Sequence, residues 1–209
     1  MTSSAPRRWV PDSDPRFAVQ ILHGMAEHAG RYDALARRLA SIGCDVWAHD
    51  HRGHGTTARD ASELGHFTWD LIVADAWRVH AAMADALPGV PRVIVAHSMG
   101  SFVAQTMMAQ FADHGPIPAG IRGVVLCGTS GPPPWMARPG LWLASLERLR
   151  VGPRGHSPLL ERLAFGAHNR HLGDAGDGGD GGDGGTKVPP YVPRTKFDWL
   201  SRDEAEVDA

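Results

Sequence analysis

The residues around Ser98 constrain the fold of this chain more than any other segment. Arg92–Ala96 (RVIVA) is rich in β-branched residues, which favour a strand, whereas Phe102–Phe111 is apolar on most sides, as in a buried helix. Only a few residues join the two segments, so the chain must turn sharply at Ser98. The small residues Ala96 and Gly100 allow strand and helix to pass close to each other. A strand, a tight turn and a helix in this order predict a serine hydroxyl raised above the end of a sheet.

Strand-like and helix-like segments alternate along the first 130 residues. The expected strands are Arg7–Val10 (an edge strand stopped by Pro11), Phe17–Leu22, Cys44–Ala48, Arg92–Ala96 and Ile121–Cys127. One helix should bury Tyr32, Leu35, Leu39 and Ile42 and end at Gly43. Another, capped by Thr68 and ended by Pro88-Gly89, should bury Ile72, Ala76, Val79, Met83 and Ala86. Such alternation predicts an α/β fold with a mostly parallel sheet and helices on both faces.

Composition excludes several classes of protein. Hydrophobic residues make up 43% and charged residues 21%, and the net charge is −2, so no basic surface for nucleic acid is expected. Cys44 and Cys127 both lie in apolar segments, which predicts two buried free thiols. The chain shows neither a secretory signal nor an apolar stretch long enough for an integral membrane segment, so we expect a cytoplasmic protein. Its oligomeric state is left open.

The sequence changes in character after residue 130. We expect residues 1–130 to form the N-terminal part of a core domain and residues 131–209 to form part of a helical cap, with an apolar helical stretch at Trp135–Phe165. That stretch suits either an acyl chain or ordinary packing. Gly173–Gly185 (GDAGDGGDGGDGG) is expected to be a disordered loop. Its aspartates could suggest calcium, but the apolar positions that build a β-helix are missing, so no metal site is expected.

Three segments occur in an order that resembles a known family. They are His23–Tyr32 (HGMAEHAGRY), Asp50–Gly55 (DHRGHG) and Ala96–Gly100 (AHSMG). Together they resemble the monoacylglycerol lipase and lysophospholipase branch of the α/β-hydrolases, which is often grouped with serine aminopeptidase S33-type hydrolases. The resemblance covers residues 7–135 well and resumes weakly at Phe197–Asp208. Ala96 departs from the family pattern, which has glycine there.

The resemblance implies a serine ester hydrolase. Its substrate would be a small acyl ester or lipid, such as a monoacylglycerol, a lysophospholipid or another carboxylic ester, with no cofactor and with transient contact to a lipid surface. Ser98 would be the nucleophile that forms an acyl-enzyme at the nucleophile elbow. The backbone N–H groups of Met25 and Met99 would form the oxyanion hole, and Gly24 would lie with them against the substrate.

Other polar residues of the three segments have more than one interpretation. Glu27, His28 and Arg31 either support the oxyanion loop as a charged network or form a solvated helix start. We expect Asp50, Arg52 and His54 to form a hydrogen-bonded structural turn. His97, next to the nucleophile, is expected to be a structural histidine, because adjacent residues at a sharp turn point apart.

The acid and the histidine of a catalytic triad are not identified. In α/β-hydrolases they follow the serine along the chain, in the order Asp or Glu and then His. The candidates are His114, His156, His168, His171, Asp198 and Asp203, none of which follows a β-rich segment where expected.

We therefore expect a truncated hydrolase, incomplete at the C-terminal side of its fold and trimmed at its start, that shows little activity by itself. A compact variant with an improvised triad and a non-catalytic binding protein remain as alternatives. Thioesterase, perhydrolase and peptidase chemistries also stay open.

Overall fold

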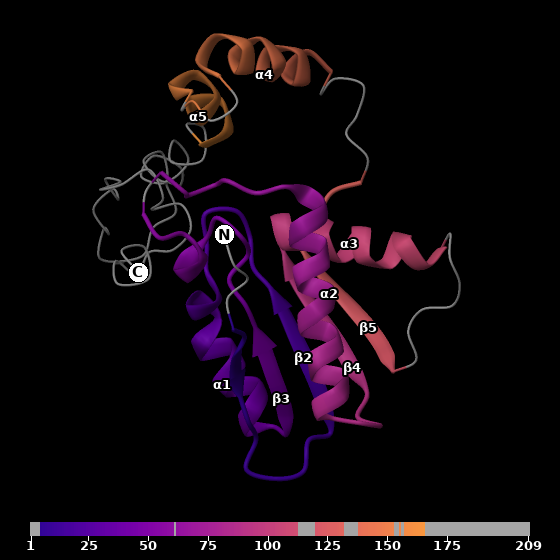
Figure 1. The fold of residues 1–209 in the computed structure, drawn as a ribbon. Coiled ribbons are helices and arrows are strands. Elements are labelled where there is room, and N and C mark those ends of the chain that lie inside the picture. Colours follow the sequence, from indigo (N-terminus) through magenta and orange to yellow (C-terminus); the bar gives the residue numbers. More distant parts are fainter. Residues whose placement is uncertain are drawn as a thin grey trace, which may run out of the picture. The chain divides into compact units, whose positions relative to one another are not determined.

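A computed structural model describes residues 5–60, 62–112, 120–131, 138–152, 155 and 157–165 of the chain. The chain divides into two compact units, Met1–Gly131 and Pro132–Ala209. The first unit contains strands and helices in alternation (Figure 1). Its elements are β1 (Arg7–Trp9), β2 (Phe17–Leu22), the 3-10 turn η1 (Ala29–Tyr32), α1 (Asp33–Ser41), β3 (Cys44–Ala48), the 3-10 turn η2 (Gly55–Thr57), α2 (Trp69–Ala86), β4 (Arg92–His97), α3 (Met99–Ala112) and β5 (Ile121–Cys127).

The five strands form one sheet in the order β1-β3-β2-β4-β5. β1 lies antiparallel to β3 at one edge, and the other neighbouring pairs are parallel. β2 and β4 are adjacent, with Leu22 paired with Ala96, so their carboxyl ends open side by side. In open α/β sheets, ligands bind outside the carboxyl ends of the strands. The topology therefore brings the residues after Leu22 and after Ala96 to one place.

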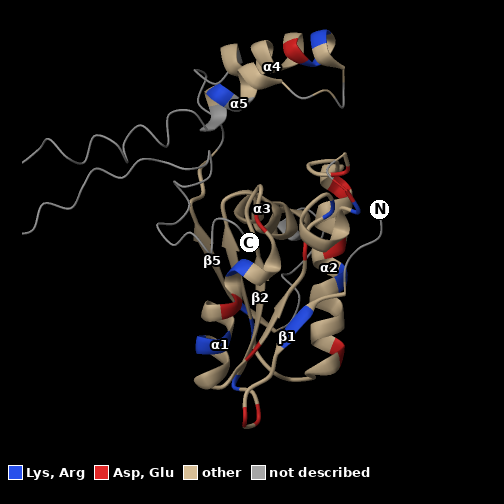
Figure 2. Cartoon of the chain, turned by 90° about the vertical axis from the view of Figure 1, so that its left-hand side faces the viewer, with Lys and Arg blue, Asp and Glu red and all other residues tan. Residues whose placement is uncertain are grey.

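Helices cover both faces of the sheet, as predicted. On one face Val19, Ile21 and Val46 are buried with Ala36 of α1. On the other face the alternate residues of β2 and β4, among them Leu22 and Ala96, are buried against α2 and α3. The expected mostly parallel α/β fold is confirmed. Acidic and basic residues are interspersed along α1 and α2 (Figure 2).

Two details of the helices differ from expectation. In α1 the buried residue is Ala36, whereas Leu35 and Ile42 are exposed. The face that meets the sheet passes through Tyr32, Ala36 and Leu39, and the small alanine lets the helix approach closely. Thr68 occupies the N-cap position of α2, but its side chain makes no capping hydrogen bond.

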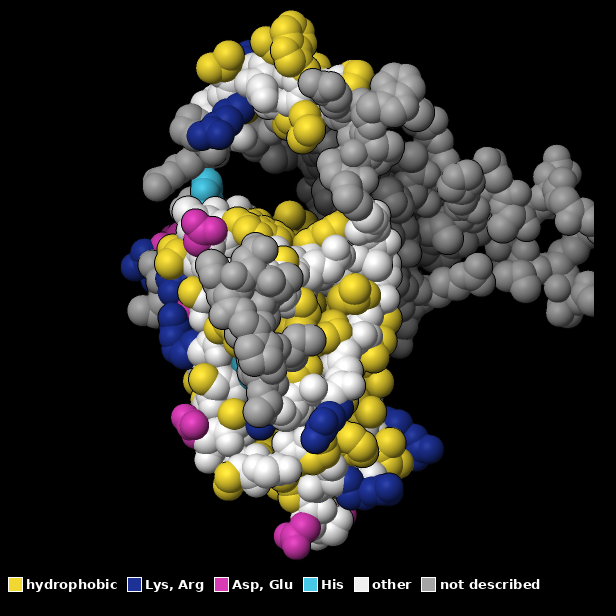
Figure 3. Space-filling view, turned by 90° about the vertical axis from the view of Figure 1, so that its right-hand side faces the viewer, with side chains coloured by type: hydrophobic (Ala, Val, Ile, Leu, Met, Phe, Trp, Pro, Cys, Tyr) yellow, Lys and Arg dark blue, Asp and Glu magenta, His cyan; other side chains and the backbone are white. Residues whose placement is uncertain are grey.

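The last turn of α2 and the strand β5 are more exposed than expected. Ala86 at the end of α2 is exposed, because it lies beyond the part of the helix that faces the sheet. Cys44 is a buried free thiol as predicted, whereas Cys127 at the end of β5 is exposed. Within the described residues β5 pairs only with β4, and Val125 and Leu126 are exposed. Hydrophobic side chains are visible on the face drawn in Figure 3.

The second unit contains α4 (Arg138–Val151) and α5 (Pro158–Phe165). The Ser157 hydroxyl donates to Glu147 (2.6 Å), and the Leu160 amide donates to the Ser157 oxygen (3.2 Å), so this serine links the two helices. The apolar side chains of Trp142 and Leu149 are exposed. Gly173–Gly185 and Phe197–Asp208 lie outside the described residues. None of the helices in the described ranges combines the length and apolarity needed to cross a membrane.

Candidate active site

The turn between β4 and α3 places Ser98 in a strained conformation. Its φ angle is 48°, in the left-handed region that residues other than glycine rarely adopt. Its amide donates to the Cys127 carbonyl (2.9 Å), and its carbonyl accepts from the Ser101 amide (2.9 Å) and hydroxyl (2.6 Å). Strain of this kind persists where the surroundings hold it, and it is concentrated at functional sites. The sharp bend predicted at Ser98 is therefore present.

Gly100 explains why a small residue follows this turn. A Cβ atom built on Gly100 would lie 2.3 Å from the Leu22 carbonyl oxygen and 2.6 Å from the His23 carbonyl oxygen. The first turn of α3 thus presses against the backbone at the end of β2, where only glycine fits. Ala96, the departure from the family pattern, is fully buried and its methyl group is accommodated in the core.

The loop that follows β2 lies against the same turn. A Cβ built on Gly24 would lie 3.1 Å from Ser98 Cβ. Met25 is 44% exposed and begins a turn whose second residue, Ala26, has a φ of 58°. In the part of the chain that the structure describes, Ala26 and Ser98 are the two residues other than glycine with positive φ. The two strained positions thus flank the point where loop and turn meet.

His23 fixes the direction of the Gly24 carbonyl. The ring is buried, and its Nε2 accepts a hydrogen bond from the His51 amide (2.9 Å), so the proton must lie on Nδ1, which donates to the Gly24 carbonyl (2.8 Å). Burial lowers the pKa of His23 to about 3, so the ring stays neutral. Because C=O and N–H point in opposite directions across a trans peptide, this bond also fixes the direction of the Met25 N–H.

Glu27 connects the loop with the end of β4. Its Oε2 accepts hydrogen bonds from the Gly24 amide (2.8 Å) and from the Tyr32 hydroxyl (2.7 Å). Its Oε1 lies 3.2 Å from His97 Nδ1 and 3.5 Å from Arg31 Nε. Burial by itself would raise the pKa of Glu27, but the bonds from Tyr32, Gly24 and His97 outweigh burial and hold the pKa below its usual value. Glu27 is therefore a buried, ionised carboxylate with several donors.

Asp50 holds the next loop in place. Its carboxylate accepts from the Ala29 amide (2.8 Å) and from the amide (2.8 Å) and hydroxyl (2.7 Å) of Thr56. A Cβ on Gly55, whose φ is 49°, would lie 2.5 Å from this carboxylate. These contacts are those of the structural turn expected here. His28 stands before η1 and its side chain makes no capping bond there.

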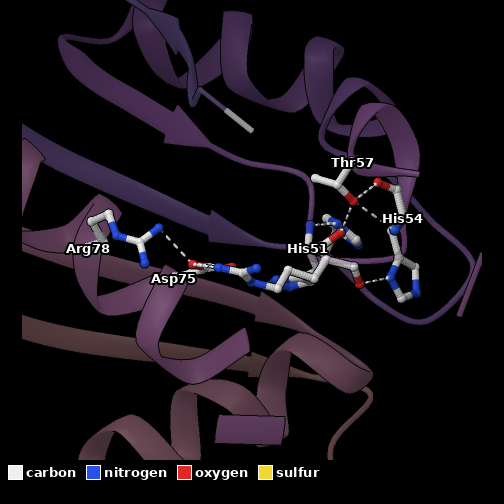
Figure 4. A network of polar contacts seen from close by, with 7 residues as sticks. His51, His54, Thr57, Asp75 and Arg78 are labelled. Carbon is white, nitrogen blue, oxygen red and sulfur yellow. Dashed lines mark hydrogen bonds and ion pairs between the residues drawn. The ribbon is translucent and has the colours of Figure 1, made fainter. Parts of the chain in front are cut away.

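Residues of this loop and of α2 form a network of polar contacts (Figure 4). The Thr57 hydroxyl lies 2.8 Å from the His51 carbonyl and 2.6 Å from the His54 carbonyl, and His54 Nδ1 contacts the Arg52 carbonyl (3.1 Å). Arg52 in turn binds Asp75 of α2 through Nε (2.5 Å) and Nη2 (3.1 Å). These two hydrogen bonds attach the loop to α2.

The four histidines of these two loops form a buried cluster. The ring of His51 lies 4.2 Å from that of His23 and 5.0 Å from that of His49, and His54 lies 5.4 Å from His23. Among the described residues, neither ring nitrogen of His49 or His51 has a hydrogen-bond partner. No group of three or more His, Cys, Asp or Glu residues suited to a metal ion occurs in the described part of the chain.

Several residues of the predicted site lie close together at one end of the sheet. Gly24, Glu27, His97 and Ser98 meet at the carboxyl ends of β2 and β4, and Met99 is the buried first residue of α3. The N–H of a first helical residue has no partner inside its helix, so it is a donor facing the strand end. The downstream candidates His114, His156, His168, His171, Asp198 and Asp203 all lie outside the described residues.

Two features of the site were not predicted from the sequence. Alanine rarely adopts positive φ, so nothing marked Ala26 as a strained position. The contact between Glu27 and His97 joins residues 70 positions apart. The sequence interpretation of Glu27 as support for the oxyanion loop pointed in its direction but did not include His97.

Comparisons with known proteins agree with this geometry. The profile of the family described as serine aminopeptidase, S33 matches residues 13–209. Residues of the chain are 38% identical over 109 residues to a monoacylglycerol lipase of Mycolicibacterium smegmatis, covering 49% of this chain and 36% of that protein. They are 34% identical over 108 residues to the human monoglyceride lipase, covering 52% of this chain and 35% of that protein. The matched part therefore spans little more than a third of these relatives.

Solved structures give the same picture. A thermostable carboxyl esterase from Bacillus coagulans superposes with a TM-score of 0.70 at 28% identity, over 97% of this chain and 58% of that one. The monoacylglycerol lipase of Paleococcus ferrophilus superposes with a TM-score of 0.51 at 25% identity, over 73% of this chain and 53% of that one. The chain therefore belongs to the serine aminopeptidase S33 family of α/β-hydrolases, as a member similar to its monoacylglycerol lipases.

Proposed function

We propose that this chain carries the nucleophile and the oxyanion hole of a serine hydrolase that cleaves acyl esters of the monoacylglycerol or lysophospholipid type. The observation that carries the proposal is the left-handed backbone of Ser98 at a bend packed against the end of β2. A bend of this geometry at the end of a strand would present the hydroxyl above the sheet, clear of the strand and helix on either side. The lipase and esterase relatives support an ester as the substrate.

In the proposed reaction, the Ser98 Oγ attacks the ester carbonyl carbon and its proton passes to a base. The Met25 and Met99 N–H groups stabilise the oxyanion of the tetrahedral intermediate, and Gly24 leaves room for it. The alcohol then departs with a proton, and water releases the acid from the acyl-enzyme. The described residues after Ser98 contain no histidine, so the base is not among them.

The state of the base determines the rate that we expect. Removing the triad histidine of subtilisin lowers kcat by about six orders of magnitude. We therefore expect the 209-residue chain to hydrolyse short p-nitrophenyl esters slowly and to react slowly with a fluorophosphonate probe, with the label on Ser98. Fast turnover would contradict this expectation and would direct attention to a histidine outside the described residues as the base.

The test compares Ser98→Ala with Ser41→Ala, which removes an exposed hydroxyl at the end of α1. Ser98→Ala should abolish both labelling and hydrolysis, and Ser41→Ala should leave both unchanged. Parallel assays with a thioester and a peptide substrate distinguish the ester chemistry from its relatives. A wild-type chain without Ser98-dependent reaction, or labelling that survives Ser98→Ala, would refute the proposal.

A further inference from the structure

Glu27 is a buried carboxylate that accepts hydrogen bonds from several donors. It is 5% exposed, although carboxylates are rarely buried without a specific set of partners. Its donors come from three places: the loop after β2, the end of the 3-10 turn η1 and the end of β4. One side chain thus joins elements that are far apart in the sequence.

Glu27 contacts the two residues that directly precede the proposed oxyanion donor Met25 and the proposed nucleophile Ser98. Glu27 Oε2 accepts a hydrogen bond (2.8 Å) from the amide of Gly24, which precedes Met25. His97, whose Nδ1 lies 3.2 Å from Oε1, precedes Ser98. The carboxylate therefore links the loop after β2 to the turn that bears Ser98.

Glu27 also closes the strained turn at Ala26. Its side chain reaches back to the Gly24 amide and forms a ring that encloses Met25 and Ala26. His23 holds the Gly24 carbonyl from the opposite side (2.8 Å). Both peptide groups that flank Gly24 are thereby fixed, one by Glu27 and one by His23. A left-handed alanine would otherwise relax to a more favourable conformation.

We propose that Glu27 is a positioning residue that couples the oxyanion loop to the nucleophile turn and so sets the separation of the Met25 and Met99 N–H donors. This inference rests on the function proposed above. Glu27 acts through Gly24 and His97 rather than by touching the substrate. Oxyanion donors have to stand near 3 Å from the developing charge, so a small displacement of the loop lowers the rate steeply.

The contacts assign His97 to the same unit. Its Nδ1 faces Glu27 and its Nε2 lies 3.6 Å from the position that a Cβ on Gly128 would occupy. The ring therefore spans from the carboxylate to the residue that follows β5. Because a carboxylate can only accept a hydrogen bond, the His97 Nδ1 that faces Glu27 carries a proton.

The experiment uses the full chain with Glu27→Ala and Glu27→Gln, and with Glu63→Gln as a matched control. Glu63 pairs with the exposed Arg59 in another loop. The first readout is hydrogen exchange of the Gly24 amide together with the ring ¹⁵N shifts of His97. Glu27→Ala should accelerate Gly24 exchange at least about tenfold and change the His97 signals, whereas amides of α2 keep their exchange rates. Glu27→Gln should fall between, because its amide oxygen still accepts from Gly24.

The second readout is ester hydrolysis. We expect Glu27→Ala to lower kcat by about tenfold to a hundredfold with little change in KM. If the wild-type chain shows no Ser98-dependent hydrolysis, the proposed function fails, while exchange and histidine signals still decide the coupling. Gly24 exchange that stays at the wild-type rate would overturn the inference. So would equal acceleration in α2, because Glu27 would then serve overall stability alone.

Discussion

Lowering the pH from 7.5 to 5.5 should destabilise this protein through its buried histidines. Burial is the largest cause of a lowered pKa at His23 (about 3), His49 (about 4) and His80 (about 4). Burial also lowers the pKa of His51 and His54. In the unfolded chain each of these rings titrates near its ordinary pKa of about 6.5. The unfolded state therefore binds more protons, and stability must fall as the pH falls through 6.5 towards the folded pKa values.

The size of the effect follows from this linkage. A ring that stays neutral when folded and titrates at about 6.5 when unfolded costs about 1.4 kcal/mol between pH 7.5 and 5.5. His23, His49 and His80 together give about 4 kcal/mol, and His51 raises the sum to about 5.5 kcal/mol. Typical domains are stable by only about 5–15 kcal/mol. Carboxylates with lowered pKa values, such as Glu27 and Asp50, lose their contribution only at lower pH, near and below their ordinary values of 4.5 and 3.8.

The assay is urea unfolding followed by tryptophan fluorescence at a series of pH values. The slope of unfolding free energy against pH should correspond to the uptake of about three to four protons near pH 5.5. His49→Leu removes a ring that makes no hydrogen bond among the described residues, so it should reduce this uptake by about one proton without weakening the protein at pH 7.5. An uptake of less than one proton, or an unchanged slope in His49→Leu, would refute the reasoning.

Three further predictions concern packing and charge. Gly100→Ala should lower the free energy of urea unfolding by about 3 kcal/mol, because its methyl group would meet the Leu22 carbonyl. Gly123→Ala meets no atom within 4 Å and should change stability little. Equal effects of the two variants would contradict the close approach at Gly100. Asp75→Ala should cost about 3–5 kcal/mol, because it removes the buried carboxylate that pairs with Arg52. Arg78→Ala removes only the exposed partner of Asp75 and should cost far less. The reverse order would contradict this prediction. Leu126→Lys places a charge on the exposed apolar strand β5 and should reduce aggregation on heating, measured by light scattering. Unchanged aggregation would show that β5 is not the surface through which the protein aggregates.

Much of the fold was predictable because its signals are local. The β-branched segments and the glycine stops define β2, β3, β4, β5 and the end of α1 within about one residue. The bend at Ser98 was predictable because a strand, a tight turn and a helix with flanking small residues have one common geometry. These features depend on neighbouring residues alone.

The features that could not be predicted depend on contacts between distant residues. Which face of α1 is buried was decided by Ala36 against the sheet, although Leu35 and Ile42 had the more hydrophobic side chains. Cys127 was predicted to be buried from its apolar neighbours, but it lies exposed at the end of β5, which is the edge strand of the sheet among the described residues. Likewise, the orientation of Gly24 depends on His23 and Glu27, whose roles emerge only when β2 and β4 are adjacent.

The Ser98 amide donates a hydrogen bond to the Cys127 carbonyl (2.9 Å), so the thiol of Cys127 is a labelling site next to the turn. The chain has two cysteines, and Cys44 is buried, so a maleimide fluorophore should attach to the exposed Cys127 alone. The dye would then sit one backbone contact from the serine without altering any residue of the site. Its emission would report each rearrangement of the bend, including those produced by acylation, in real time.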